Sequence, residues 1–524
     1  MDTPISLARR RFLQMGATLT AVGALGLSGE SIAAATPAAP ALRLNKFTIL
    51  RRAMKGRLLL PDDNAYMMAA YPNNARWAHV LPKAVAMCAD AGDVRKCIEW
   101  AITYGERFAI RSGGHSYAGF STTTGLLIDV KAMNKVTVDL ERQIAIVQAG
   151  ASNQNIANAL NSTPFAIPSG RCPTVGVSGL VLGGGWGFAA THAGLTCDSL
   201  LETDIVLANA KQVTAKPESC TDDLFWALRG GGGGNFGVNT SFTFQLHKVD
   251  NVTVFNILWP GQQQVEMLRR LQEIQQTHAT SMSTRTKAYP DKPGARPKME
   301  QLQVTTLGIF WGDEKQTREA LAPALNLVTP IGLDIRTMNY WQARDYMATD
   351  DPTGMYDLRS SYVAEALSEE GLETMLQWMT KWPGGSLLPE NMGILFAIGG
   401  EVRNIKPDAT AYVHRNANYI FEMEAAWAPI DSPDIVRAQK RWLTDYFNAM
   451  QKYLLPQSYV NFPSRELKDW KNAYYGSNLE RLSVIKGKYD PLNLFKFEQS
   501  IPRQFKKSTQ QCSNFLGYFN RASV

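Results

Sequence analysis

Two short glycine-rich stretches each carry one side chain that can act as a nucleophile. His115 lies in RSGGHSYAGFS (residues 111–121), and Cys172 lies in PSGRCPTVGVSGLVLGGGWGFAATHAGLTCDSLL (residues 168–201). Because glycine has no Cβ, these loops can adopt positive φ and turn backbone N–H groups toward an anionic ligand. Together the two stretches indicate one large, anionic and electrophilic cofactor held between them.

The size and composition of the chain restrict the class of protein. At 524 residues it exceeds a single hydrophobic core, so we expect two or three domains. A hydrophobic content of 45%, a charged content of 19% and a net charge of +7 are those of a globular protein. Basic residues are scattered along the chain, which argues against nucleic-acid binding. No cysteine or histidine spacing suits zinc, so we expect no metal site.

Residues 1–35 have the pattern of an export signal. Three arginines at positions 9–11 precede Phe-Leu, a mild apolar run covers residues 15–27, and three alanines occupy positions 33–35. Paired arginines followed by Phe-Leu resemble a twin-arginine signal, which would export the folded protein to the periplasm or the medium. The alternative is an uncleaved membrane anchor, although the run is shorter than the roughly 20 apolar residues of a span. No other stretch is long enough, so we expect no stable membrane span after signal removal.

Six cysteines leave the disulfide pattern open. They are Cys88, Cys97, Cys172, Cys197, Cys220 and Cys512. Export permits disulfides, and Cys88 and Cys97 flank a short polar segment, so this pair is our candidate for a bridge. The oligomeric state stays open as well.

Hydrophobic periodicity predicts the elements around the two stretches. Residues 93–104 have helical spacing, with Asp93 placed to cap the helix. Residues 222–229 predict a helix ended by the five glycines 230–234, because glycine terminates helices. Residues 236–246 alternate as a strand with one buried face.

A domain boundary is expected near Asp250. Beyond it, strands and helices interleave without a βαβ rhythm, which favours an antiparallel sheet carrying helices. The predicted strands are 253–259, 302–310, 393–398 and 417–426, and the predicted helices are 262–278, 367–380 and 434–453.

Five motifs, taken in order, resemble one family of flavoproteins. They are RSGGHSYAGFS, GRCPTVGVSG, LGGGWG, DLFWALRGGGGGNFG and the terminal YYGSNLERL with KYDPLNLF. Together they resemble the berberine bridge enzyme-like FAD-linked oxidases of the vanillyl-alcohol oxidase/p-cresol methylhydroxylase superfamily. The resemblance is strong over residues 74–250 and 470–502, and between them it rests on length and on Tyr459-Val460-Asn461.

The resemblance implies an α+β fold in which both ends of the chain build the cofactor domain. The FAD-binding domain of the p-cresol methylhydroxylase type would comprise residues 36–250, with its core at 74–250, and a berberine-bridge-like tail at 466–524. The substrate domain, residues 251–465, would be inserted between them and built on an antiparallel sheet covered by helices.

In this family the two nucleophiles would hold FAD bicovalently, His115 through the flavin 8α-methyl and Cys172 through C6. Alternatively, His115 only forms a hydrogen bond and Cys172 is a small packing residue. The other residues expected to contact the cofactor are Arg111, Ser112, Gly113, Gly114, Ser116, Val175, Gly176, Gly179, Gly183, Gly184, Val238 and Asn493. No GxGxxG opens a helix after a strand, so the site is not of the Rossmann type. Many relatives have histidine where this chain has Leu180, so one hydrogen bond to the flavin would be missing.

The resemblance also assigns roles in the chemistry. Tyr459 matches the base of carbohydrate-oxidising relatives, and strand alternation would place Asn461 on the same face, where it could polarise the phenol. Tyr117 matches a substrate-contact position. Val175 lies where valine accompanies oxidase behaviour and larger side chains accompany poor oxygen reactivity. The alternatives are that Tyr459 is an interface tyrosine and that Val175 only packs.

The function that follows is that of an exported FAD oxidase acting on an alcohol carbon. It would take a hydride from a sugar, an oligosaccharide or another alcohol and reduce O₂ to H₂O₂, with a base accepting the hydroxyl proton. The first alternative is a flavin dehydrogenase of a secondary metabolite or aromatic alcohol that uses a quinone or cytochrome. The second is a flavin-binding protein without turnover.

Overall fold

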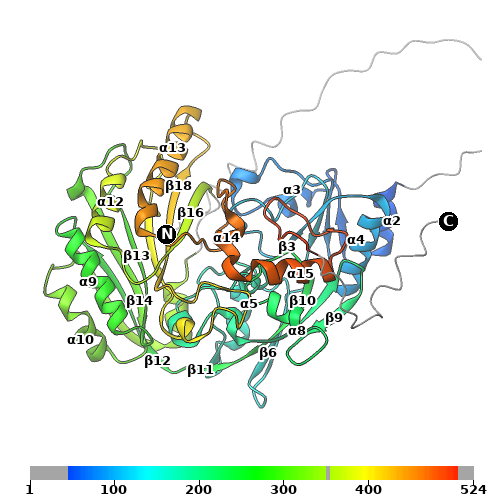
Figure 1. The fold of residues 1–524 in the computed structure, drawn as a ribbon, viewed down its shortest axis with the longest axis horizontal. Helices are drawn as coiled ribbons and strands as arrows, with labels where there is room; N and C mark the ends of the chain where they lie inside the picture. The colour runs from blue at the N-terminus through cyan, green and yellow to red at the C-terminus, as the bar shows by residue number, and fades with distance from the viewer. Residues whose placement is uncertain (1–44, 350–353, 505–524) are drawn as a thin grey trace, which may run out of the picture. The chain divides into compact units, whose positions relative to one another are not determined.

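The structure is a computed structural model that describes residues 45–349 and 354–504 (Figure 1). The predicted export signal, Cys512 and the end of the tail lie outside these residues. The described chain combines helices with three antiparallel sheets, one of them only two-stranded, and one mixed sheet, so the α+β class is confirmed.

Residues 46–129 form a four-stranded sheet of order β1-β2-β4-β3, in which β4 is parallel to β2 and β3. Its strands are β1 (Arg57–Leu59), β2 (Ala84–Met87), β3 (Phe108–Arg111) and β4 (Leu126–Asp129), and its helices are α2 (Lys46–Ala53), α3 (Tyr66–Ala70) and α4 (Ala91–Tyr104). The cap of α4 is Asp90, whose Oδ1 accepts from the Asp93 amide at 3.0 Å, and the helix ends at Gly105 with φ 58°. The predicted cap, Asp93, is wrong: its carboxylate accepts from two backbone amides that precede β1.

Residues 136–248 add a five-stranded antiparallel sheet of order β5-β6-β10-β8-β9. Its strands are β5 (Val136–Asp139), β6 (Ile144–Gln148), β8 (Leu200–Leu207), β9 (Gln212–Ala215) and β10 (Gly237–Gln245), and the helices between them are α5 (Asn153–Leu160), α6 (Val177–Leu182), α7 (Ala190–Ala193) and α8 (Asp222–Ala227). β7 (Phe165–Ala166) and β11 (His247–Lys248) pair separately. The predicted strand 236–246 is β10, at the centre of the sheet, and the predicted helix 222–229 is α8.

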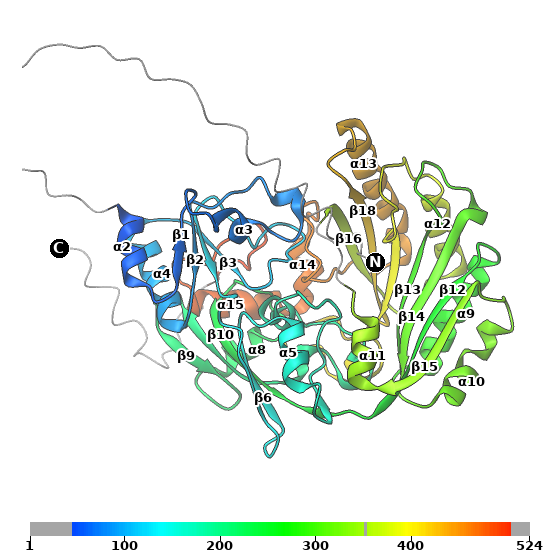
Figure 2. The ribbon, with the colours of Figure 1, turned by 180° about the vertical axis from the view of Figure 1, so that it is seen from behind.

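Residues 251–427 build a seven-stranded antiparallel sheet of order β15-β12-β14-β13-β17-β18-β16 (Figure 2). The strands are β12 (Asn251–Trp259), β13 (Met282–Pro290), β14 (Leu302–Phe310), β15 (Gly332–Asn339), β16 (Met355–Val363), β17 (Gly393–Ala397) and β18 (Tyr419–Trp427). The helices are α9 (Gln264–Thr277), α10 (Glu314–Leu325), α11 (Tyr340–Met347), α12 (Glu369–Met379) and α13 (Pro433–Met450). The expected antiparallel sheet with helices is confirmed, although the sequence pattern did not predict β13, β15 or β16.

The two faces of the large sheet have different partners, as β18 shows. Tyr419, Phe421 and Met423 belong to a hydrophobic cluster with α9, α12 and α13. The alternate residues Glu422 and Glu424 face a cavity instead. This period of two is what strand geometry requires when one face is covered by helices.

The C-terminal segment returns to the N-terminal half through α14 (Trp470–Tyr475) and α15 (Leu479–Tyr489) (Figure 1). Lys486 on α15 is fully buried and pairs with Asp490 at 2.6 Å. Its ammonium also donates to the carbonyls of Asn235, at 2.6 Å, and Phe495, at 2.7 Å. One buried cation therefore ties the tail to the loop that follows the five glycines.

The candidate bridge between Cys88 and Cys97 is not formed. Both are buried thiols, and a hydrogen bond to Cys97 together with burial raises the pKa of Cys88 well above its ordinary value. Within the described ranges, no helix is both long and apolar enough to cross a membrane.

Candidate functional site

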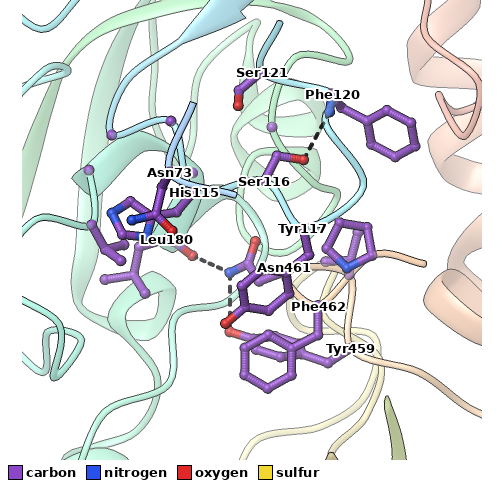
Figure 3. A pocket seen from close by; sticks show the side chains of 18 of the residues that line it. Asn73, His115, Ser116, Tyr117, Phe120, Ser121, Leu180, Tyr459, Asn461 and Phe462 are labelled. Carbon is purple, nitrogen blue, oxygen red and sulfur yellow. Dashed lines mark hydrogen bonds between the residues drawn. The ribbon is translucent and has the colours of Figure 1, made fainter. Parts of the chain in front are cut away.

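A cavity of about 760 Å³ brings together the two glycine-rich stretches and the face of the large sheet that its helices do not cover. Its walls come from four parts of the chain: the His115 loop, the Cys172 loop with α6, the glycine run after α8, and the segment from Tyr459 to Gln499. The strands β13, β17 and β18 close the remaining side. Segments hundreds of residues apart thus share one site, shown in part in Figure 3.

The two nucleophile loops are in direct contact. His115 Nε2 lies 3.0 Å from Thr174 Oγ1. A Cβ on Gly113 would lie 2.3 Å from the Gly176 amide nitrogen, so these glycines permit backbone to pack on backbone. The Cys172 carbonyl accepts from Asn153 on α5 at 2.9 Å. The loops that carry His115 and Cys172 are therefore held in a fixed relation before any ligand binds.

The polar lining of the cavity suits a large cofactor with many hydrogen-bonding groups. Ser121 Oγ and Asn153 Oδ1 line the cavity, are buried, and have no hydrogen-bond partner among the described residues. A buried polar atom left unsatisfied costs about 1–3 kcal/mol, so such atoms point to a missing ligand. Together with two glycine loops and a cavity of this size, they fit FAD.

Most of the predicted cofactor residues line this cavity. They are Ser112, Gly113, Gly114, His115, Ser116, Cys172, Val175, Gly176 and Gly179. The predicted residues outside the lining are Arg111, Gly183, Gly184, Val238 and Asn493.

Three of the residues outside the lining have structural roles of their own. The buried guanidinium of Arg111 donates to the carbonyls of Ala69, at 2.6 Å, and Ser121, at 2.9 Å, so it fixes the loop from behind. Val238 is buried in β10. Asn493 has φ 54°, a left-handed conformation that shapes the turn after α15.

Sequence reasoning missed several lining residues. The largest group is Gly232, Gly233, Gly234, Asn235, Gly237 and Asn239, joined by Tyr475, Phe495, Lys496, Phe497 and Gln499 from the tail. The signal for this group is the run of five consecutive glycines, of which the sequence analysis uses only the termination of a helix. A single helix terminus needs one glycine, so the length of the run indicated a second role.

The Tyr459 hydroxyl is surrounded by N–H donors. The Gly185 amide donates to it at 3.0 Å and the Trp186 amide at 3.1 Å. Asn461 Nδ2 is the third donor, at 3.1 Å (Figure 3). Asn461 also donates to the Leu180 carbonyl at 2.8 Å, which fixes its amide. A neutral phenol must donate its own proton, whereas a phenolate only accepts, so three donors favour the ionised form.

Burial acts in the opposite direction on this tyrosine. Tyr459 is 1% exposed, and burial raises the pKa of its phenol to about 12, while the bonds from Asn461, Gly185 and Trp186 lower it. The phenol is therefore protonated at neutral pH, and the three donors offset part of the effect of burial on its pKa.

The glycines of LGGGWG build this donor set. Gly184 has φ 115° and Gly185 has φ 92°, both in the left-handed region where a Cβ is strained. A Cβ on Gly185 would lie 2.4 Å from Thr196 Oγ1, and one on Gly183 would lie 2.2 Å from Asn461 Oδ1. These glycines therefore aim two adjacent amides at one phenol oxygen.

Aromatic rings cover the space in front of Tyr459. Phe462 lies 5.0 Å from Tyr459 and 5.3 Å from Tyr117 between ring centroids, and Phe396 on β17 lies 5.7 Å from Phe462 and 4.8 Å from Trp186. Tyr117 and Tyr459 thus contact the same ring, that of Phe462, and the substrate-contact role of Tyr117 stays a prediction.

Comparison with known proteins places these features in a family. The FAD binding domain model matches residues 82–216, and the berberine and berberine like model matches residues 458–502. YvdP of Bacillus subtilis, an uncharacterized FAD-linked oxidoreductase, is 33% identical over 86% of this chain and 98% of its own. A monolignol oxidoreductase of Arabidopsis thaliana is 28% identical over 76% and 79%. The xylooligosaccharide oxidase of Myceliophthora thermophila, solved with xylobiose, superposes with a TM-score of 0.76 at 26% identity, over 88% of this chain and 100% of that one.

Proposed function

Because the chain belongs to the berberine bridge enzyme-like FAD-linked oxidoreductases, we propose that it oxidises the CH–OH group of a small alcohol and passes the electrons to O₂. The single observation that carries the proposal is the Tyr459 phenol, held by three N–H donors at the wall of a cavity that also contains His115 and Cys172. A sugar, an oligosaccharide or another alcohol would be the donor.

The chain's own groups account for the proton and for substrate placement. Bound FAD would accept the hydride, and O₂ would reoxidise the flavin and be reduced to H₂O₂. Tyr459, as phenolate, takes the hydroxyl proton, and the amides of Gly185 and Trp186 stabilise the phenolate before that transfer. The rings of Tyr117 and Phe462 exclude water from the reacting carbon. Loss of one proton and one hydride converts the alcohol to its carbonyl compound.

The proposal includes a bicovalent FAD, attached through His115 and Cys172. Support comes from their positions on two interlocked loops at the cavity wall, with His115 in contact with Thr174. A cofactor attached at two points is retained outside the cell, which agrees with the export signal read in residues 1–35. We therefore place the mature protein in the periplasm or the medium.

Oxygen is proposed as the acceptor because of Val175. This residue lines the cavity beside Cys172, and its small side chain leaves more room there than leucine or isoleucine would. If the reduced flavin of the enzyme is reoxidised only slowly in air, the acceptor is instead a quinone or a cytochrome.

Replacing Tyr459 by phenylalanine tests the base. Tyr459→Phe removes the phenol oxygen. With an alcohol that the native enzyme oxidises, we expect the anaerobic rate of flavin reduction to fall by about 10²- to 10⁴-fold, the usual range for a general base. Tyr446→Phe is the matched control, since it removes another buried phenol that lies in the helix-covered core and has no hydrogen-bond partner among the described residues. An unchanged rate in Tyr459→Phe would remove the base assignment.

A further inference from the structure

The two peptide groups that donate to the proposed base are hydrogen-bonded at both ends. The Gly185 amide shares its peptide group with the Gly184 carbonyl, which accepts from the Cys197 amide at 2.9 Å. The Trp186 amide shares its peptide group with the Gly185 carbonyl, which accepts from the Thr196 amide at 3.0 Å and from Thr196 Oγ1 at 3.1 Å. Hydrogen bonds in such a chain polarise one another and strengthen by about 10–30% each, so a donor at the carbonyl makes the amide a stronger donor in turn.

The two carbonyl partners are consecutive residues of one turn, η2 (Thr196–Ser199), which Asp198 closes. Asp198 Oδ2 accepts from the Leu195 amide at 2.8 Å, and the Asp198 amide donates to the Leu195 carbonyl at 2.9 Å. Thr196 is fully buried, and its single hydroxyl proton is shared with the Pro168 carbonyl, 2.5 Å away. The turn is therefore fixed to the start of the second glycine-rich stretch as well as to the LGGGWG loop.

A buried ion pair holds the turn from the segment that precedes β18. Arg415 binds Asp198 through Nη1 to Oδ2 at 2.9 Å and Nη2 to Oδ1 at 2.7 Å, and the two side chains are 1% and 7% exposed. The Arg415 guanidinium also lies 4.9 Å from the ring centroid of Tyr412. A Cβ on Gly184 would lie 2.9 Å from Cδ2 of Tyr412, whose ring centroid is 6.3 Å from that of Tyr459. The LGGGWG loop thus lies between the turn and Tyr412, and one ion pair connects the two.

This ion pair supplies geometry more than stability. Desolvation offsets most of the attraction in a buried pair, so apolar residues of similar volume are often as stable. A bidentate pair nevertheless fixes the relative position of the two segments that it joins. Hydrogen bonds weaken steeply when the donor is misaligned, so the two amides at 3.0 and 3.1 Å from the Tyr459 oxygen depend on that position.

We propose that Thr196 and Asp198 are positioning residues for the oxidation, which hold the two peptide groups of the LGGGWG loop with their N–H bonds directed at the Tyr459 oxygen. The inference rests on the proposed role of Tyr459 as the base. Among the described residues that line the cavity there is neither Thr196 nor Asp198, so both act through the amides and not by contact with the substrate. Arg415 keeps the Asp198 carboxylate in place.

The ionisation of Tyr459 can be measured without any substrate. 3,5-Difluorotyrosine at position 459 has a more acidic phenol than tyrosine, and the NMR shift of its fluorine nuclei reports the charge of the ring. A pH titration of the labelled holoenzyme therefore gives the pKa of this phenol. The titratable neighbours of the ring, which every variant below keeps, are Cys197, Tyr412 and Tyr362.

The Thr196 hydroxyl is tested by three substitutions in the labelled protein. Thr196→Val removes the hydroxyl and keeps the backbone amide, and we expect the pKa of the labelled phenol to rise by about 0.5 unit. Thr196→Ser keeps the hydroxyl and should restore the native value. Thr317→Val is the matched control, because it removes a buried hydroxyl in α10 that donates to the Asp313 carbonyl at 2.7 Å.

A double variant tests the ion pair without leaving a single buried charge. Asp198→Leu with Arg415→Met removes the carboxylate that closes the turn and leaves the net charge unchanged. We expect the pKa of the labelled phenol to rise by about one unit. With tyrosine at position 459, flavin reduction at neutral pH by an alcohol that the native enzyme oxidises should slow by about ten-fold, while the dissociation constant of that alcohol stays the same. Lys46→Met with Glu106→Leu is the matched control, since this pair, at 2.7 Å, joins α2 to the residue after Gly105.

The pKa and the rate of flavin reduction are measured separately, so the two proposals fail differently. A lower melting temperature with an unchanged pKa in Thr196→Val would show that the turn is only structural and would overturn the inference, as would equal shifts in the control variants. If the double variant does not fold, Thr196→Val decides alone. Shifts confined to the Thr196 and Asp198 variants, without flavin reduction by any alcohol, would support the positioning of the donors and overturn alcohol oxidation. Flavin reduction by an alcohol at a rate that ignores both residues, with an unchanged pKa, would support alcohol oxidation and overturn the inference.

Discussion

Removing the Asn461 amide should lower the ionised fraction of Tyr459 without removing its phenol. Asn461 Nδ2 is one of three donors to the Tyr459 oxygen, at 3.1 Å. A hydrogen bond to a charged group contributes about 1.5–3 kcal/mol, and one pKa unit corresponds to about 1.4 kcal/mol. Asn461→Leu should therefore raise the pKa of Tyr459 by about one to two units and slow flavin reduction at neutral pH by about 10- to 100-fold.

The sign of the pH dependence follows from the same tyrosine. Only the phenolate accepts a proton, and burial raises the pKa of Tyr459 to about 12, so the active form is the minor one at neutral pH. The anaerobic reduction rate should rise about ten-fold per pH unit between pH 7 and 9, in the native protein and in Asn461→Leu alike, when proton removal limits the rate.

A chemical rescue distinguishes ionisation from misplacement. Fluorination of the tyrosine ring lowers the phenol pKa, so fluorotyrosine at position 459 should restore most of the rate lost in Asn461→Leu. The assay is stopped-flow flavin reduction under anoxia with a substrate that the native enzyme oxidises. If the fluorinated double variant stays as slow as Asn461→Leu, the amide only positions the ring and our account of the three donors is refuted.

Further predictions concern the cofactor loops. His115→Ala and Cys172→Ala should each retain flavin in acid-precipitated protein through the remaining link, whereas the double variant should release it, and peptide masses identify the attachment sites. Val175→Leu should slow reoxidation by O₂ while leaving anaerobic reduction unchanged, which separate stopped-flow experiments measure. Gly185→Ala should lower the free energy of unfolding by about 1–3 kcal/mol, since it adds a Cβ at φ 92° beside a threonine hydroxyl. Gly332→Ala, where a Cβ meets only an ordinary contact at 3.6 Å, should be close to neutral in the same denaturant titration.

Local signals in the sequence were enough to find the loops, and non-local contacts explain most of what was missed. His115 and Cys172 stand in short motifs whose glycines are adjacent in the chain, so their meeting could be predicted. The hydrogen bond from the Gly185 amide to Tyr459 could not be predicted, because the two residues are 274 positions apart in the sequence. A glycine-rich stretch predicts that its backbone N–H groups donate hydrogen bonds, but it does not predict which oxygen atom accepts them.

The missed strands have a related cause. β16 contains Asp357 and Arg359, whose side chains are each 5% exposed; Asp357 pairs with Arg76, and Arg359 donates to Ser464 from a distant segment. Charged residues inside a strand hide the alternation that predicts it, and only the folded chain shows that they have partners. The α4 cap is Asp90 and not the predicted Asp93 for the same reason. The carboxylate of Asp93 accepts a hydrogen bond from the Lys55 amide, which belongs to another segment.

The buried Lys486 has a consequence for the order in which the protein is made. Its ammonium contacts the Asn235 carbonyl across 251 positions, and residues 495–497 close the cavity from the tail. The ribosome must therefore synthesise nearly the whole chain before Lys486 can bind the segment that follows the glycine run. Cofactor capture is then an event of the completed polypeptide, and a messenger truncated before α15 yields a chain that has both nucleophile loops but an open cavity.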